Sequence, residues 1–174
     1  LYAGQISLKI GLAVALLSTV VGTVVGAIAG YLGKATDQVL MRVTDLFLIV
    51  PALAVLAIAL KKFGHDDVTI IWVLAALFWM YVARVVRAQV LSLKEQEFVE
   101  AARASGASGP WIVARHILPN CIGPIVVNAT LAVAAAIVAE STLSFLGFGV
   151  QLPATSWGRM LSDAEGYVGT SQSY

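Results

Sequence analysis

The stretch LKEQEFVEAARASGASGPWIVARH, residues 93–116, is a polar segment in a chain that is otherwise strongly apolar. Residues 84–116, which include it, hold five of the eleven basic and three of the ten acidic residues of the chain. Apolar runs long enough to cross a lipid bilayer flank this region on both sides. We therefore expect residues 93–116 to lie in water between two membrane-spanning helices.

Composition places the chain among integral membrane proteins. Hydrophobic residues make up 59% and charged residues 12% of the sequence, whereas about a quarter of the residues of a soluble domain are charged. The apolar runs predict an all-α fold, a polytopic bundle of helices in the lipid bilayer. A net charge of +1, without a basic run interleaved with aromatic residues, argues against nucleic acid as a partner. The one cysteine, Cys121, has no Cys or His neighbour at metal-ligand spacing, so we expect no metal site.

Four segments approach the length of about 20 apolar residues that a spanning helix needs. They run from Ile10 to Tyr31, from Thr44 to Leu60, from Val68 to Val86 and from Cys121 to Ala139. The chain begins without a methionine or a basic leader, and we interpret it as a fragment of a longer protein.

The basic residues predict which loops face the cytoplasm. Seven of them fall in the loop after the first span and in residues 84–116. The four on the opposite side are Lys9, Lys61, Lys62 and Arg159. Cytoplasmic loops carry an excess of Lys and Arg. Residues 93–116 are therefore predicted to face the cytoplasm, and residues 151–167 the outside.

Two spans contain residues that affect how their helices pack. Gly22, Gly26 and Gly30 share one helix face, which lets another backbone approach closely. That face fits either a contact with another subunit or packing against a helix of the same chain. In the second span Pro51 lacks a backbone N–H, and it predicts a kink between Phe47 and Pro51.

Glu140 is a carboxylate embedded in apolar sequence, directly after AAAIVA at residues 134–139. An acid within a span is a candidate contact for protons or substrate. Ser141 and Thr142 start helices readily, and they predict a break at Glu140 followed by a short helix that ends at Gly147. Two interpretations stay open, a residue of the transport pathway or a structural residue at the outer end of the span.

The polar segment itself predicts two short helices. Residues from Leu93 to Ala104 are good helix formers with an apolar and a charged side. Gly106 can adopt the left-handed conformation that ends such a helix. Pro110 suits the first turn of the next helix, from Trp111 to His116, which we expect to stop before Pro119. Two exposed helices joined at a glycine suit docking into a groove of a partner.

Several separated motifs resemble those of one family. Glu100-Ala101-Ala102, followed by Gly106 and Leu118-Pro119, resembles the EAA loop of the permease subunits of bacterial ABC importers. RHILPN at 115–120, ESTLSFLG at 140–147 and SWG at 156–158 are similar to the dipeptide and oligopeptide branch, and within it to the C-type permease subunit. The resemblance covers about residues 6–168.

The resemblance implies a fold, a location and partners. It implies a permease domain of six spans, of which residues 1–174 form a single domain with about four, the first and last being absent. It implies the cytoplasmic (inner) membrane of a bacterium, a second permease in a heterodimer, two ABC ATPase subunits and an external substrate-binding protein. The chain contains no G-x-x-x-x-G-K-[ST] loop. We therefore expect a transporter subunit that is no enzyme and has no cofactor, with ATP and Mg on the ATPase subunits.

The resemblance also assigns residues to two surfaces. In the loop 93–119, the surface that docks on the ATPase subunits is implied to consist of Glu100, Ala101, Ala102, Arg103, Gly106, Ala107, Arg115 and Pro119. The surface that faces the binding protein is implied to include Pro153, Trp157 and Gly158. The alternative for residues 151–167 is a helix that lies flat at the lipid headgroups. The implied mechanism is alternating access, in which ATP-driven movement of the docked loop tilts the spans.

Other functions are kept as alternatives. The implied substrate is a dipeptide or oligopeptide, with nickel chelates or haem-like compounds as the alternative. An ion-coupled carrier would need charged or broken helices at mid-membrane, for which Glu140 is the candidate. An intramembrane enzyme would have to bring Glu140, Asp45 and His65 together, although the last two are expected near opposite faces of a bilayer about 30 Å thick. No motif such as H-E-x-x-H or G-x-S-x-G accompanies them.

Overall fold

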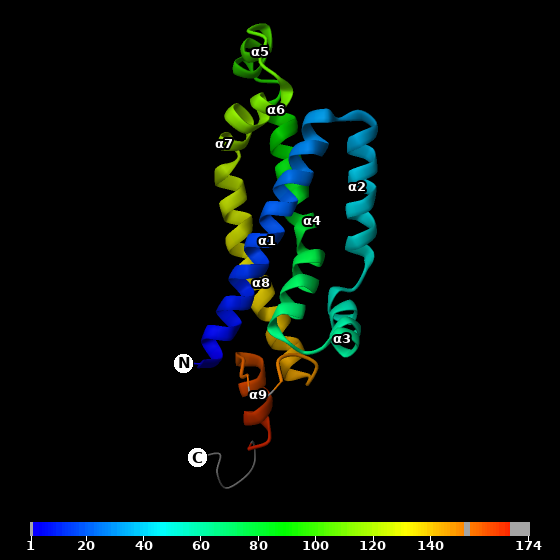
Figure 1. Ribbon diagram of the computed structural model, residues 1–174, viewed down its shortest axis with the longest axis vertical. Helices are drawn as coiled ribbons and strands as arrows, with labels where there is room; N and C mark the ends of the chain where they lie inside the picture. The colour runs from blue at the N-terminus through cyan, green and yellow to red at the C-terminus, as the bar shows by residue number, and fades with distance from the viewer. Residues whose placement is uncertain (1, 152–153, 168–174) are drawn as a thin grey trace. The chain divides into compact units, whose positions relative to one another are not determined.

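The computed structural model describes residues 2–151 and 154–167, and within these ranges the regular elements are all helical (Figure 1). They are α1 (Tyr2–Leu32), α2 (Lys34–Ile49), α3 (Ala52–Phe63), α4 (Asp67–Leu93), α5 (Glu97–Ala104), α6 (Gly109–Ile112), η1 (Val113–Ile117), α7 (Leu118–Asn120), α8 (Ile122–Phe145) and α9 (Trp157–Glu165). The element η1 is a π-helical turn. The predicted all-α fold is confirmed.

Three of the described helices, α1, α4 and α8, are long and apolar enough to cross a membrane. Helices α2 and α3 pass the same test only as a pair bent by 79°, which is either a broken span or a re-entrant loop. The number of spans reaches the predicted four if this pair counts as one span. The predicted kink in that span is a complete interruption, because α2 ends at Ile49 and α3 begins at Ala52. Between them Pro51 has an extended backbone, with φ −69° and ψ 106°.

The described residues fall into two compact units. The first unit comprises residues 2–15, 50–77, 131–151 and 154–167, and the second comprises residues 16–49 and 78–130. The first therefore includes α3 and α9, and the second includes α2 and the whole polar segment. Helices α1, α4 and α8 contribute residues to both units.

In the second unit, α1 and α4 pack closely through glycines. A β-carbon added at Gly26 would lie 2.5 Å from the carbonyl oxygen of Ala83 and 2.9 Å from Cβ of Val86. At Gly22 the nearest atom of α4 would lie 2.5 Å from such a β-carbon, and at Gly30 it would lie 2.8 Å away. The glycine face predicted from the sequence is thus occupied by a helix of the same chain, and this observation decides between the two interpretations.

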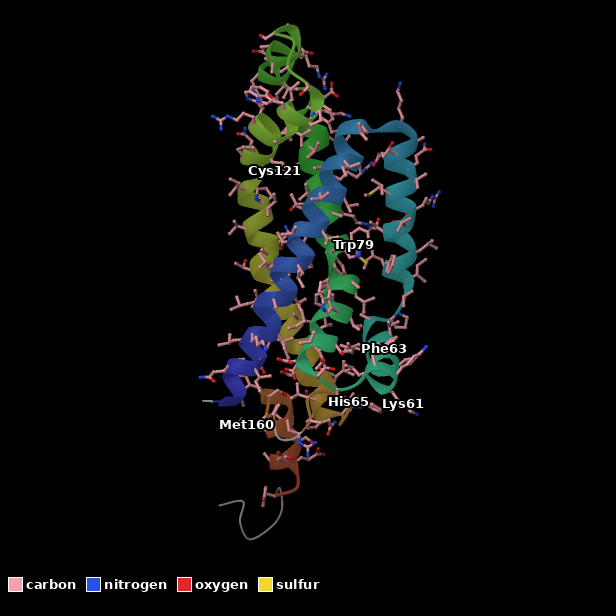
Figure 2. The ribbon with its side chains drawn as sticks, viewed as in Figure 1. Lys61, Phe63, His65, Trp79, Cys121 and Met160 are labelled. Atoms are coloured by element: carbon pink, nitrogen blue, oxygen red, sulfur yellow. The ribbon has the colours of Figure 1, made fainter. Side chains whose placement is uncertain are left out.

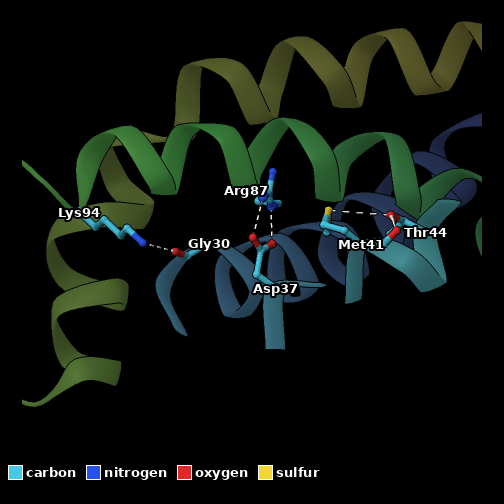
Figure 3. Close-up of polar contacts among 6 residues, drawn as sticks. All are labelled: Gly30, Asp37, Met41, Thr44, Arg87 and Lys94. Carbon is cyan, nitrogen blue, oxygen red and sulfur yellow. Dashed lines mark hydrogen bonds and ion pairs between the residues drawn. The ribbon is translucent and has the colours of Figure 1, made fainter. Parts of the chain in front are cut away.

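Polar side chains join α2 to α4 in the same unit (Figure 3). Both carboxylate oxygens of Asp37 accept hydrogen bonds from the guanidinium of Arg87. Nζ of Lys94 donates to the carbonyl oxygen of Gly30, in α1, over 3.2 Å. The bidentate pair of Asp37 and Arg87 satisfies both charges in an otherwise apolar chain. This pair holds the first turn of α2 against α4.

In the first unit, Asp66 and Gly147 determine where two helices begin and end. Asp66 caps α4, because its carboxylate accepts hydrogen bonds from the hydroxyl of Thr69 over 2.7 Å and from the N–H of Thr69 over 3.2 Å. These hydrogen bonds, the one from the hydroxyl above all, lower the pKa of Asp66. Gly147 has a φ of 82° and follows the end of α8, where the N–H of Phe148 bonds to the carbonyl of Leu143.

The predicted break at Glu140 is wrong, because α8 continues through this residue without interruption. The hydroxyl of Thr142 donates to the carbonyl of Val138 over 2.8 Å, and that of Ser144 donates to the carboxylate of Glu140 over 2.6 Å. These hydroxyls bond within their own helix and cap no new one. The helix therefore ends at Phe145, two residues before Gly147, and not at the acid.

Candidate functional site

The first short helix of the polar segment begins later than predicted. Helix α4 continues to Leu93, so the predicted start of the short helix belongs to the end of α4. After a turn at residues 94–96, α5 follows past the end of α4 (Figure 1). Val99 of α5 is fully buried, whereas Glu97, Glu100 and Arg103 are exposed. The predicted amphipathic character is therefore present, on a shorter helix.

A Schellman motif ends α5 at Gly106. This glycine has a φ of 81°, in the left-handed region that disfavours residues with a side chain. The N–H of Ala107 donates to the carbonyl of Ala102 over 3.1 Å, and the N–H of Gly106 donates to that of Arg103 over 2.9 Å. Ala102 and Ala107 both pack on the apolar cluster below the helix. The glycine four residues after Ala102 is therefore the position at which this type of helix end needs a left-handed residue.

The second predicted helix consists of three short pieces that lead into α8. Helix α6 begins at Gly109, with Pro110 in its first turn as predicted. The expected stop before Pro119 is wrong, because this residue lies inside α7. The wider π turn of η1 precedes the proline, and the side-chain amide of Asn120 donates to the carbonyl of His116 over 2.7 Å. Together they accommodate a residue that has no N–H to donate.

A buried apolar cluster in the second unit holds the short helices in place. Its fully buried members from α4 onward are Val86, Val90, Val99, Ile112, Ile117 and Cys121. Burial raises the pKa of the thiol of Cys121, which is labelled in Figure 2. The guanidinium of Arg103 lies 5.7 Å from the ring centroid of Tyr31, at the end of α1. The polar segment is therefore attached to both α1 and α4.

An open groove of about 790 Å³ lies over these short helices. Its lining residues are Phe98, Ala101, Ala102, Ser105, Gly106, Ala107, Ser108, Trp111 and His116. The ring of His116 lies between two others, with centroids 6.3 Å from Phe98 and 5.0 Å from Trp111. Small residues leave space in the groove, and the three rings give it apolar surface. Such a groove can accept a protruding part of another protein.

The structure places the predicted docking residues in two groups. Half of them line the groove, namely Ala101, Ala102, Gly106 and Ala107. The other half are exposed outside it, namely Glu100, Arg103, Arg115 and Pro119. The prediction did not include Phe98, Trp111 and His116. A large exposed apolar side chain in a polar segment, as at Phe98 and Trp111, is a signal that could have identified them.

The predicted outer surface lies in the first unit. Trp157, the first residue of α9, is 42% exposed. Gly158 is buried, and a β-carbon added there would overlap the carbonyl oxygen of Ser141. This glycine therefore supports the packing of α9 and does not form surface. Pro153 lies outside the described residues. Glu140 is buried and accepts hydrogen bonds from serine hydroxyls.

The residues considered for an intramembrane enzyme each have a different partner. Asp45 forms an ion pair with Arg84. Nδ1 of His65, labelled in Figure 2, lies 3.0 Å from the carbonyl oxygen of Phe148. The carboxylate of Glu140 accepts from hydroxyls. Within residues 2–151 and 154–167, no three His, Cys, Asp or Glu side chains are grouped as a metal ion would require.

Fold and site together define an all-helical membrane protein with several spans and an exposed helical loop between two of them. Residues 22–170 match the family described as the inner membrane component of binding-protein-dependent transport systems, and the chain belongs to this family. It is therefore a multi-pass membrane protein.

The chain is also similar to permease proteins of peptide transport systems. It is 47% identical to the oligopeptide transport system permease protein OppC of Escherichia coli (strain K12) over 160 residues, which are 92% of this chain and 53% of that protein. It is 41% identical to the dipeptide transport system permease protein DppC of Bacillus subtilis (strain 168) over 162 residues, 93% of this chain and 51% of that protein. The chain spans about half the length of the curated relatives it matches.

Proposed function

We propose that this chain forms the membrane-spanning part of a permease subunit in an ATP-driven importer of dipeptides or oligopeptides. The observation that carries the proposal is the groove over α5 and α6, in a loop attached to α1 and α4. A partner that displaces this loop displaces the ends of two spans with it. The names of the relatives favour peptides over nickel chelates and haem-like compounds.

The docking partner that we propose for the groove is an ABC ATPase subunit. The sequence predicts that the two short helices enter a groove of the partner, and the groove on this loop adds a surface that would receive an apolar side chain of that subunit. The exposed Glu100, Arg103 and Arg115 would make charged contacts around it. ATP and Mg²⁺ would be bound by the ATPase subunits, and this chain would contribute no catalytic group. A second permease subunit would complete the pathway, and an external binding protein would deliver the peptide.

In this proposal ATP acts through alternating access. When two ATPase subunits close on ATP, they would draw the docked loops of the two permeases together. The contacts of the polar segment with Tyr31, Val86 and Val90 would convert that displacement into a tilt of α1 and α4. Hydrolysis would release the ATPase subunits and reset the spans.

Uptake into proteoliposomes tests the proposal. The full permease pair, with its ATPase subunits and binding protein, is reconstituted, and uptake of a labelled tripeptide is measured. We expect uptake when ATP is inside the liposomes, on the side of the ATPase subunits, and the binding protein is outside. We expect no uptake when the ATPase subunits or ATP are omitted. Uptake that runs on an imposed proton or sodium gradient without ATP would contradict the proposal and favour an ion-coupled carrier.

A further inference from the structure

A buried hydrogen-bond network in the first unit plays no part in the coupling proposed above. At its centre is Glu140, which is 1% exposed. Its Oε1 accepts from the hydroxyl of Ser144 over 2.6 Å, and its Oε2 accepts from the hydroxyl of Ser7 over 3.2 Å. Ser7 and Ser144 are themselves buried. One carboxylate thus joins α1 to α8.

The same two hydroxyls accept hydrogen bonds from the segment that follows α8. Oγ of Ser144 accepts from the N–H of Val150 over 3.1 Å, and Oγ of Ser7 accepts from the N–H of Trp157 over 3.2 Å. A hydroxyl has one hydrogen and two lone pairs. Because each hydrogen is directed at Glu140, the lone pairs are free to face the two amides. The carboxylate therefore sets the orientation of both hydroxyls.

Close packing supports the same arrangement on each side of residues 152–153. A β-carbon added at Gly149 would overlap Ser144, as one at Gly158 would overlap Ser141. Val150 is 2% exposed and fits the same buried environment. These residues cannot move away from α8 without losing packing as well as hydrogen bonds.

We propose that Glu140 is a positioning residue that fixes residues 149–151 and the start of α9 as a surface for the substrate-binding protein. The exposed side of α9 supports this role, because Met160, labelled in Figure 2, is 52% exposed and Leu161 is 61% exposed. Asp163, on the same short helix, forms an ion pair with Arg159 over 3.2 Å. The identity of this partner rests on the proposed function. The positioning role rests on the hydrogen bonds and the close packing, and not on the partner's identity.

Amide hydrogen exchange of the full transporter complex tests the positioning role. Glu140→Leu removes both acceptor oxygens and keeps an apolar side chain in a buried site. We expect the amides of Val150 and Trp157 to exchange about tenfold faster or more, the change that follows when buried groups lose well-oriented partners. Glu140→Gln keeps one acceptor oxygen, so it should accelerate exchange at only one of the two amides.

Two serine variants separate the branches of the network. Ser144→Ala should accelerate exchange at Val150 alone, and Ser7→Ala should accelerate it at Trp157 alone. Thr142→Val is the matched control, because the hydroxyl of Thr142 bonds to a carbonyl of its own helix. Unchanged exchange at both amides in serine variants that insert normally would overturn the positioning role, even if Glu140→Leu fails to fold.

A second readout tests the surface. In the reconstituted complex, Glu140→Leu should raise severalfold the concentration of binding protein that gives half-maximal stimulation of ATP hydrolysis. An unchanged half-maximal concentration, together with faster exchange, would overturn the assignment of this surface to the binding protein. A wild-type complex that no binding protein stimulates would instead contradict the proposed function, and the exchange result would stand independently.

Discussion

Gly106 meets two requirements that can be tested separately, a left-handed backbone and free space beside the groove. A side chain at a φ of 81° costs about 1 kcal/mol. An added β-carbon meets no atom within 4 Å, so bulk would extend into the space proposed for the partner. We expect Gly106→Leu to insert at near wild-type level but to lose co-purification with the ATPase or ATP-coupled uptake.

Gly106→Ala is the matched control for this prediction, because it has the same backbone strain and almost no bulk. It should retain more of the association with the ATPase than Gly106→Leu does. Both variants are compared by affinity co-purification and by peptide uptake. Full, coupled transport by Gly106→Leu would mean that the loop is not the contact that transmits force.

Cys121 is expected to be unreactive in the folded protein. Its thiol is buried, and burial raises its pKa, while the thiolate is the species that reacts. A raised pKa leaves less thiolate at neutral pH. Labelling by a maleimide at pH 7.5 should therefore be at least about tenfold slower than for an exposed cysteine introduced as Ser108→Cys. Mass spectrometry measures the labelled fraction, and rapid labelling of Cys121 before denaturation would contradict the buried position.

At the scale of helices, the contact between α1 and α4 depends on the absence of side chains at three glycines. A β-carbon at Gly26 would lie 2.5 Å from a backbone carbonyl, which cannot move as a side chain can. Gly26→Leu should therefore lower the free energy of unfolding by about 3 kcal/mol or more. Ile28→Leu, at an exposed position of the same helix, is the control and should have almost no effect. Unfolding in detergent, followed by circular dichroism, measures both, and equal stability of the two variants would show that α1 and α4 do not pack this closely.

The sequence predicts elements well where the pattern is local. Hydropathy identifies the spans, and the left-handed requirement at Gly106 identifies the end of α5. The prediction fails where a side chain has two possible partners. Thr142 could start a new helix or bond within the helix that it belongs to, and in the structure its hydroxyl donates to the carbonyl of Val138 while α8 continues. In the same way, the aromatic groove forms because η1 brings His116 next to Phe98, and no local spacing encodes that contact.

For the whole molecule, charge and site lead to one expectation about orientation. Seven basic residues fall in the loop after the first span and in residues 84–116, against four on the other side. The positive-inside rule therefore places the polar segment in the cytoplasm. The proposed function needs the same orientation, because ATPase subunits act from the cytoplasm and a binding protein acts from outside. These two arguments are independent, since one uses charge and the other uses the groove.

Cysteine labelling on intact cells tests this orientation. In a Cys121→Ala background, Ser108→Cys and Met160→Cys are suitable probes because both positions are exposed, whereas Ser156 is fully buried and would label poorly at either face. A membrane-impermeant maleimide should label Met160→Cys in intact cells, and Ser108→Cys only after the membrane is opened. Labelling of both after opening controls for expression. Labelling of Ser108→Cys but not Met160→Cys in intact cells would invert the orientation, and the groove would then face away from any source of ATP.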